Sequence, residues 1–353
     1  MNSIKLNETP RRTSRNFNIN NIKLDNIDIP DKLNKFNGLT ILNDTSKITI
    51  EELERSNLDL TYGVGILNKN SNKNLRISID SKQNKELVLD FRLDKQNKNL
   101  VDNIEIIANE ASKVTIIIKY SCRGELCSPA QMYHNATIKL NAKKNSNINV
   151  IVVNLLNQES NNFVSIENNL EENANVNYTI VDFGGKNSIS NYYSNILGDY
   201  SSNNLSTIYL GTNEQLFDLN YIAELRGKKT NINIEVQGAL GNSSKKHFKG
   251  TIDFKKGSKK AKGNENESCM LLSDKAKSIA LPMLLCSEED VEGNHSSSAG
   301  KIGNKELFYI MSRGLSEKEA MKLMVRAKFN SILESIKNEE LKNEILYYIE
   351  NKL

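Results

Sequence analysis

The amino-acid sequence predicts a mainly β protein that ends in a small helical unit, and three observations support this prediction. From about Leu75 to about Thr251, β-branched runs recur at intervals of about 20 to 25 residues, separated by turns rich in Asn, Gly, Ser and Lys. Apolar and polar residues alternate within the runs, as in half-buried strands. No amphipathic stretch typical of a helix lies between them, and helical periodicity begins only after Gly300.

Two all-β architectures fit this pattern. One is a sandwich built from hairpins, and the other is a solenoid in which each coil stacks on the next. The periodicity alone divides them about evenly. Four asparagines favour the solenoid slightly, because Asn tolerates the left-handed backbone of tight corners: Asn109, Asn145, Asn173 and Asn175. The runs contain no short exact repeat, so a solenoid would be an irregular one.

The C-terminal residues predict a group of short helices. The stretch KELFYIMS begins the first, which ends near Gly314, a residue suited to a helix C-cap. Ser316 and Glu319 have the spacing of a capping box, so a second helix should begin at Glu317. Its apolar stripe consists of Met321, Val325, Phe329, Ile332 and Ile336. We expect this stripe and the last helix (Leu341, Ile345, Tyr348, Ile349) to pack on the β-domain or, alternatively, on a partner.

The balance of charge argues against a nucleic-acid partner. The 353 residues include 47 basic and 43 acidic ones, for a net charge of +4, without a concentrated basic stripe. The one local basic cluster lacks interleaved aromatic residues and is better explained as a solvated turn. It consists of Lys255, Lys256, Lys259, Lys260 and Lys262.

Other features concern the cellular compartment. The first residues carry no apolar core of a signal peptide, and no stretch approaches the roughly 18 apolar residues of a membrane-spanning helix. We therefore expect a cytoplasmic protein that does not enter a membrane. Four cysteines in so long a chain do not make a disulfide framework, so they should be thiols: Cys122, Cys127, Cys269 and Cys286.

The sequence predicts no enzymatic activity. It contains no G-x-x-x-x-G-K-[ST] loop, so we expect no nucleotide binding of the P-loop type. Three scattered histidines do not suggest a Ser–His–Asp or Cys–His nucleophilic set.

One long stretch resembles a known family. The segment PMLLCSEEDVEGNHSSSAGKIGNKELFYIMSRGLSEKEA, from Pro282 to Ala320, is similar to the C-terminal part of SufB and SufD proteins, which act in iron–sulfur cluster assembly. Upstream, HFKGTIDF and CMLLSDKAK match further family segments in the same order. Near the N-terminus, Asn7, Pro10, Arg12 and Thr13 match the family's N-x-x-P-x-R-T opening more weakly.

The resemblance implies a right-handed parallel β-helix and so favours the solenoid. It divides the chain into a short, mixed N-terminal segment (residues 1–74), a β-helix core (75–300) and a C-terminal helical unit (301–353). The last part would dock a SufC-like ABC ATPase through Leu307, Phe308, Tyr309, Met311 and Arg313. The terminal strands would pair with a SufB-like paralogue.

The resemblance also suggests which residues meet a cluster. His295 matches the family's histidine, and imidazole is a common iron ligand. Glu267 stands where SufB has its essential cysteine, and Ser296 replaces the glutamate that follows the histidine in SufB. Both departures favour a SufD-like, non-catalytic scaffold without an intrinsic cofactor, which would share a transient iron–sulfur cluster with its partner.

The cysteines have competing interpretations. Cys286 is the second tentative cluster ligand, since thiolate suits iron–sulfur clusters, but its apolar neighbours favour a buried core cysteine somewhat more. Cys269 is interpreted as a core cysteine. Cys122 and Cys127 with His134 make an incomplete zinc pattern, which we interpret as incidental.

Two alternative functions remain open at this point. Within the family, the chain could be a self-pairing homodimeric scaffold that uses Cys286 and His295 of both copies. Outside it, the chain could be a β-solenoid that binds carbohydrate or serves as a surface protein, although the absence of Trp and of a leader argues against this.

Overall fold

The computed structural model of the chain describes residues 3–11, 19–42, 47–56, 58–65, 67–122 and 131–353. This part contains twenty strands and three helices. The first four strands belong to the N-terminal segment: β1 (Ser3–Leu6), β2 (Ile22–Asp25), β3 (Leu39–Leu42) and β4 (Ile48–Glu52). The next sixteen are β5 (Lys73–Ile79), β6 (Lys85–Leu93), β7 (Asn99–Ala108), β8 (Lys113–Cys122), β9 (Tyr133–Ala142), β10 (Asn147–Leu155), β11 (Asn161–Leu170), β12 (Asn175–Asp182), β13 (Asn187–Ile196), β14 (Ser202–Gly211), β15 (Leu216–Leu225), β16 (Asn231–Leu240), β17 (Lys245–Phe254), β18 (Ala261–Leu271), β19 (Lys277–Cys286) and β20 (Val291–Lys301).

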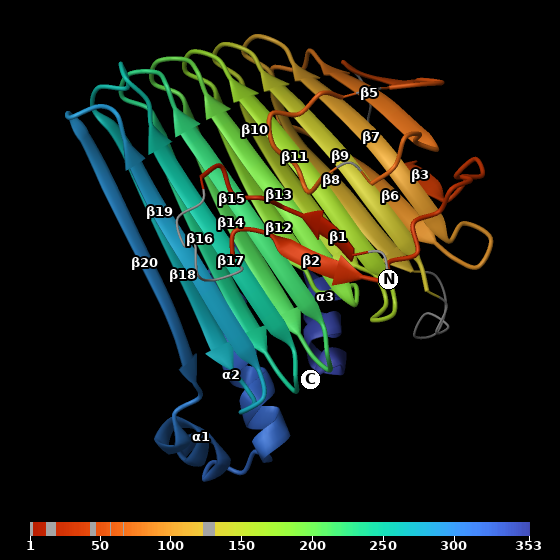
Figure 1. Ribbon diagram of the computed structural model, residues 1–353, viewed down its shortest axis with the longest axis vertical. Helices are drawn as coiled ribbons and strands as arrows, with labels where there is room; N and C mark the ends of the chain where they lie inside the picture. The colour runs from red at the N-terminus through yellow and green to blue at the C-terminus, as the bar shows by residue number, and fades with distance from the viewer. Residues whose placement is uncertain (1–2, 12–18, 43–46, 57, 66, 123–130) are drawn as a thin grey trace.

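These sixteen strands form a parallel β-solenoid of about eight turns (Figure 1). Each strand pairs in parallel with the strand two places further along the chain, so odd-numbered and even-numbered strands build separate sheets. We call the even-numbered sheet the helix-side sheet and the odd-numbered one the strap-side sheet. The prediction of a mainly β chain with a solenoid core and a small C-terminal helical part is confirmed, and the sandwich is excluded.

The alternation in the strands fills the space between the two sheets. Every second residue of a strand points into this lumen, and the parallel register stacks each inward residue on its equivalent in the next coil. The lumen is mostly apolar: Ile116, Val150, Tyr178, Leu205 and Ile234 form one such inward row. The core is thus continuous along the solenoid axis, and no coil could bury its apolar side chains alone.

The corners between coils are a second stacked feature. One series of corners has a left-handed residue in each of six successive coils: Ala111, Asn145, Asn173, Tyr200, Lys229 and Lys260. Each of these residues donates its backbone N–H to a carbonyl of the next coil. This ladder of hydrogen bonds offsets the cost of a left-handed backbone at residues other than Asn and Gly.

The asparagine prediction was therefore half right. Asn145 and Asn173 hold left-handed corners, whereas Asn109 lies two residues before the left-handed Ala111, and Asn175 begins β12. Asparagines also stabilise the stacking of coils away from the corners. Asn204 Nδ2 donates to Asn177 Oδ1, and Asn177 Nδ2 donates to Asn149 Oδ1, at 2.8 and 2.9 Å. Such amide ladders require identical residues in register.

The first part of the N-terminal segment, with β1 and β2, lies on the outer face of the strap-side sheet, as Figure 1 shows in red. The antiparallel pair β1–β2 packs Leu6, Ile22 and Leu24 against Phe163 and Ile189 of that face. β3 and β4 pair antiparallel with β6 and β5 and extend the two sheets at the end of the solenoid where the first coil lies.

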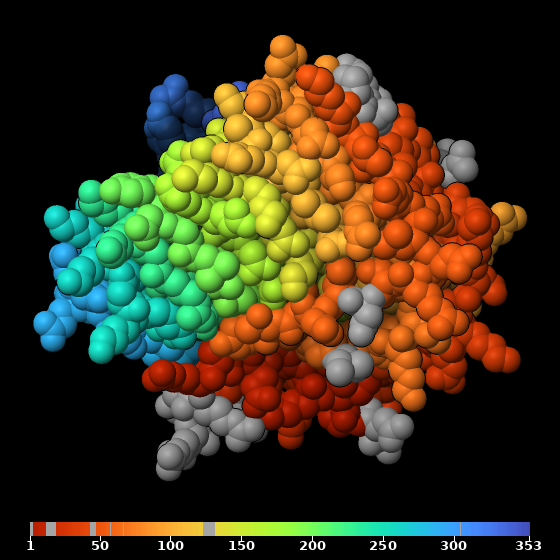
Figure 2. All heavy atoms as spheres, turned by 90° about the horizontal axis from the view of Figure 1, so that it is seen from above, coloured from red at the N-terminus to blue at the C-terminus, as the bar shows by residue number. Residues whose placement is uncertain are grey.

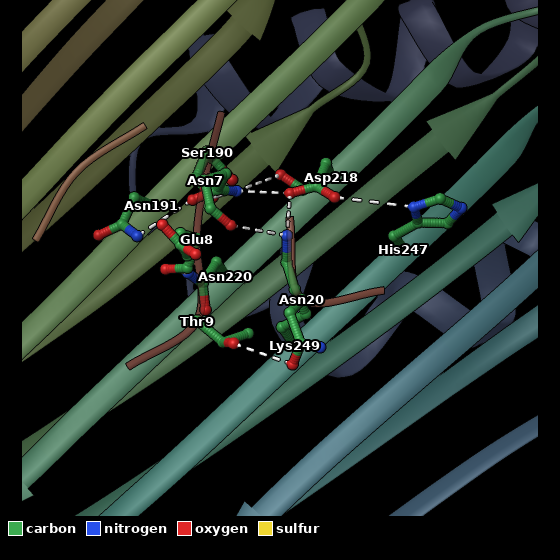
Figure 3. Close-up of polar contacts among 10 residues, drawn as sticks. All are labelled: Asn7, Glu8, Thr9, Asn20, Ser190, Asn191, Asp218, Asn220, His247 and Lys249. Carbon is green, nitrogen blue, oxygen red and sulfur yellow. Dashed lines mark hydrogen bonds and ion pairs between the residues drawn. The ribbon is translucent and has the colours of Figure 1, made fainter. Parts of the chain in front are cut away.

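Asn7 fastens the N-terminal segment to three strands (Figure 3). Its side-chain Nδ2 lies 2.6 Å from Asp218 Oδ1 and 2.9 Å from the carbonyl oxygen of Ser190, while its Oδ1 accepts from Asn191 Nδ2. Lys249 Nζ donates to the backbone carbonyl of Asn7 at 2.9 Å and to Asp218 Oδ1 at 2.6 Å. Asn7 itself has a φ of 55°, which asparagine adopts more readily than most residues. Arg12 and Thr13, from the same sequence motif, lie outside the described residues.

Three helices follow the solenoid: α1 (Asn304–Met311), α2 (Glu317–Leu333) and α3 (Glu339–Lys352). The Ser316–Glu319 capping box is present and α2 begins at Glu317, as predicted. Gly314 has the positive φ of a helix terminus, although α1 ends at Met311.

The helices α2 and α3 cover the outer face of the helix-side sheet, opposite the N-terminal segment (Figure 2). Val325 and Phe329 pack on Val181 and Ile208 of that face, so the prediction that these stripes pack on the β-domain is confirmed. The three-part division of the chain stays a prediction, because both end segments are packed on the solenoid. None of the described helices is long and apolar enough to span a membrane.

Candidate functional site at the last coil

The two ends of the solenoid differ. At the first coil, β3 and β4 pair with β6 and β5, whereas no described strand pairs with the outer edge of β19 or β20. The inward face of the last coil is therefore uncovered within the described part of the chain, and most of β20 is exposed. We call this end, formed by β19 and β20, the open end. The predicted ligands His295 and Cys286 both lie there.

His295 lies in the middle of β20 and is exposed. It is the register partner of Glu265 in β18. The side chains of register partners in a parallel sheet lie on the same face of the sheet, and the side chain of Glu265 is buried in the lumen. The His295 side chain is thus on the lumen side of β20 and is exposed because its coil is the last.

Cys286 is the last residue of β19 and the register partner of Phe254, a core residue of the lumen. Its side chain is accordingly on the lumen side, but it is exposed. The interpretation of Cys286 as a buried core cysteine is therefore wrong. The apolar neighbours Leu284 and Leu285 suggested burial, yet a residue of the last coil has no further coil to cover it.

The structure does not bring His295 and Cys286 together within one chain. Gly250 on β17 packs against Glu265, and the register one coil further on places Pro282 opposite His295. Cys286 is four residues beyond Pro282, which is roughly 13 Å along a strand at about 3.3 Å per residue. Both residues remain candidate ligands at the open end, His295 on β20 and Cys286 on β19. Across the described residues, no group of three or more His, Cys, Asp or Glu side chains is arranged to hold a metal ion.

A buried ion pair lies one coil inside the open end, between β17 and β18. Lys246 Nζ donates to Glu267 Oε1 at 2.7 Å, and Ser297 of the last coil donates its hydroxyl to Glu267 Oε2 at 2.8 Å. Cys269, two residues further along β18, is buried as predicted, and burial raises the pKa of its thiol. It is therefore a poor thiolate ligand at neutral pH.

Glu265 is the residue of this end that the sequence analysis missed. It is 2% exposed, and burial, with the nearby charge of Glu267, raises its pKa to about 8. The signal that could have identified Glu265 in the sequence is the combination of residues on β18 and β17. Glu265 and Glu267 alternate inward in an otherwise apolar row, and Gly250 in the G-x-I segment leaves room for a large side chain opposite.

The predicted docking patch lies on α1. Phe308 and Tyr309 are 73% and 60% exposed, and Met311 is also exposed, whereas Leu307 is half-buried. The guanidinium of Arg313 lies over the ring of Tyr309, 5.2 Å from its centroid. None of the described residues of α1 is buried, whereas α2 and α3 each bury an apolar stripe against the solenoid.

The remaining candidates have structural surroundings. His134 lies in the lumen with Nδ1 2.6 Å from Asn162 Oδ1 and Nε2 3.2 Å from Asp102 Oδ1, so both ring nitrogens are engaged. Cys122 Sγ accepts from the backbone N–H of Asn157 at 3.2 Å. Cys127 lies outside the described residues. These contacts support the interpretation of the pattern as incidental.

Two lysines at the ends of the basic cluster form ion pairs. Lys255 Nζ lies 2.6 Å from Asp253 Oδ2 and 3.0 Å from Glu224 Oε1, and Lys262 pairs with Glu292 at 2.9 Å. The cluster belongs to the corner between β17 and β18 and the start of β18, next to acidic groups of neighbouring strands.

Comparison with known proteins decides the family. Residues 91–328 match the family described as "SUF system FeS cluster assembly, SufBD core domain". The chain belongs to the SufB/SufD family. The match spans the solenoid from the end of β6 through most of α2, so it includes His295, Cys286 and α1 of this SufB/SufD chain.

Two relatives illustrate the similarity. The chain is 28% identical over 165 residues to the iron–sulfur cluster assembly protein SufD of Bacillus subtilis, an alignment that covers 47% of this chain and 38% of the relative. It is 22% identical over 237 residues to an iron–sulfur cluster assembly SufBD family protein of Staphylococcus epidermidis, covering 67% and 50%. The chain thus matches half or less of the length of these relatives.

Proposed function

We propose that this chain is a SufD-like, non-catalytic scaffold subunit of a SufBCD-type complex that assembles iron–sulfur clusters. The observation that carries the proposal is the asymmetry of the solenoid. Added antiparallel strands extend the sheets at the first coil, whereas the last coil exposes two strand edges beside the candidate ligands. An open solenoid end with unpaired edges is a surface suited to a partner of the same architecture.

The strand β20 supports pairing in particular. It runs for 11 residues without proline, and its side chains from Ser296 to Ala299 are small. Neither a proline nor a bulge, two features that usually prevent strand addition, interrupts this edge, and its charged residues Glu292 and Lys301 lie near its two ends. A SufB-like paralogue is the partner that we propose for it, since the family includes both proteins.

The SufD-like assignment rests on Glu267 and Ser296. Glu267 stands where SufB-type sequences have their essential cysteine, and here it is neutralised by Lys246 inside the lumen. A carboxylate held in this way does not replace a free thiolate. The principal thiolate would therefore come from the partner, with His295 and Cys286 contributing ligands to a transient cluster at the interface.

The exposed side chains of α1 support a second partner. Phe308 and Tyr309 form an uncovered aromatic patch with Arg313, and aromatic residues and Arg are frequent anchors of interfaces. We assign this patch to a SufC-like ATPase, whose motion would be transmitted through α1 to β20.

The three described cysteines are free thiols, which fits the cytoplasm as the compartment.

Anaerobic co-purification tests the proposal. The tagged chain is co-expressed with the SufB-like and SufC-like proteins of its host, and iron and acid-labile sulfide are measured. A stable three-component complex whose cluster content falls in His295→Ala, but not in Asn294→Ala on the opposite face of β20, supports the proposal. Failure to form any complex contradicts it. A homodimer that carries iron and sulfide without the SufB-like protein favours the self-pairing scaffold instead.

A further inference from the structure

Glu265 is a buried carboxyl group without a partner. Its side chain is 2% exposed, and neither Oε1 nor Oε2 has a hydrogen-bond partner within the described ranges of the chain. Leaving a polar group buried and unpaired costs on the order of 1–3 kcal/mol, and more for a charged one. Folded proteins rarely retain such a group without a function or an absent ligand.

The neighbouring cation does not serve Glu265. Lys246 Nζ contacts Glu267 Oε1 at 2.7 Å, and Ser297 satisfies the other oxygen of Glu267. On the facing strand, Gly250 has no side chain, and a Cβ there would lie 2.0 Å from Glu265 Oε2. The absence of a side chain at Gly250 therefore makes space for the carboxyl group of Glu265.

His295 is the next residue outward from Glu265. The two are register partners on β18 and β20, on the same face and about 4.8 Å apart, the usual spacing of paired strands. His295 is exposed and Glu265 lies one coil deeper. The histidine is thus placed between solvent and the carboxyl group at the mouth of the lumen.

We propose that Glu265 and His295 together bind ferrous iron at the open end, with Glu265 as a carboxylate ligand below the imidazole. The inference rests on the proposed function, in which iron is the cargo. Imidazole and carboxylate are a donor set that divalent iron accepts. Because burial raises the pKa of Glu265 to about 8, iron would displace a proton from this carboxyl group and then supply the positive counter-charge that the buried carboxylate lacks. Sulfide or a side chain of the partner subunit would fill the remaining coordination positions.

Anaerobic equilibrium dialysis of the full chain against ferrous iron tests this site. We expect one ferrous ion per wild-type chain and nitrogen and oxygen ligation by X-ray absorption. Glu265→Gln keeps the shape of the side chain and should weaken binding about tenfold or more. Glu292→Gln is the matched control, because Glu292 lies on the outer face of the same strand pair, where it forms an ion pair with Lys262. It should bind iron as the wild type does.

A second variant separates ligation from folding. Gly250→Ala leaves both ligands in place but pushes the Glu265 carboxyl aside, so it should also weaken iron binding while circular dichroism stays unchanged. Wild-type affinity in Glu265→Gln, or a wild-type chain that binds no iron, would overturn the inference. Co-purification of Glu265→Gln with the partner proteins tells the two proposals apart. A complex that forms normally but binds less iron supports both, whereas a wild-type chain that forms no complex contradicts the proposed function alone.

Discussion

Inside the solenoid, Lys246 Nζ lies 2.7 Å from Glu267 Oε1, and neither side chain is exposed. The pair links the two sheets, since Lys246 belongs to β17 and Glu267 to β18. Ser297 joins it from the last coil through its hydrogen bond to Glu267 Oε2. This ion pair thus neutralises two buried charges one coil inside the open end.

Breaking this pair should destabilise the chain strongly. Glu267→Ala leaves the Lys246 ammonium buried and unpaired, which costs about 3–5 kcal/mol. The double variant Lys246→Met with Glu267→Leu removes both charges and should recover most of the loss. Urea unfolding followed by circular dichroism measures both. An equal loss of unfolding free energy in the single and double variants would show that side-chain packing, and not the unpaired charge, determines the effect.

Removal of the Asn7 side chain should release the N-terminal segment. Asn7→Gly permits the same positive φ but loses the contacts to Asp218 and Ser190, and a hydrogen bond to a charged group contributes about 1.5–3 kcal/mol. We expect faster hydrogen exchange in β1 and β2 with little change in β13. Asn26→Gly is the control, since Asn26 also has a φ of 55° but is exposed. Similar exchange in both variants would contradict a fastening role for Asn7.

Substitutions in α1 should separate binding from stability. Phe308→Ala and Tyr309→Ala remove exposed side chains, so they should leave the unfolding midpoint within error and weaken ATPase binding by about 2 kcal/mol or more in combination. Calorimetric titration with the SufC-like protein measures the affinity. Tyr347→Ala, on α3 and 66% exposed, is the matched control. Undiminished affinity in the α1 variants would place the docking surface elsewhere.

Stability should fall as the pH rises through the titration of Asp182. Burial raises the pKa of this carboxyl group to about 6, although Asn154 and Ser188 donate hydrogen bonds to it. Because the folded state holds the proton more tightly than the unfolded state, the contribution is complete below about pH 4. It is lost as the pH approaches 6 and above, by about 3 kcal/mol for two pKa units.

Asp182→Asn tests that pH dependence. The stability of the variant relative to wild type should increase between pH 4 and pH 7, as urea midpoints at several pH values would show. The exposed Asp25→Asn serves as control. If the difference between Asp182→Asn and wild type stays constant over this range, Asp182 is not the group responsible.

The parts of the fold that depend on nearby residues could be predicted from the sequence. Alternation identified the strands, and the spacing of Ser316 and Glu319 located the start of α2. Stacking between coils could not be predicted locally, because register partners such as Glu265 and His295 are 30 residues apart. That stacking also explains why Tyr200 and Lys229 adopt a left-handed backbone that their side chains disfavour.

The same reason limited the prediction of the site. His295 and Cys286 were identified by resemblance, and their placement at the open end depends on which coil is last. The exposure of Cys286 and the burial of Glu265 follow from this single fact, since each coil is covered only by its neighbour. Residue type alone suggests a buried cysteine and an exposed glutamate, the opposite of what the structure shows at Cys286 and Glu265.

Hydrogen–deuterium exchange of the chain, alone and with the SufB-like protein, tests most directly whether the open end is the surface that pairs. We expect amides of β19 and β20 to become protected in the complex, while those of β3 and β4 at the other end do not change. Protection at β3 and β4, or no change at β20 in a complex that has formed, would contradict it.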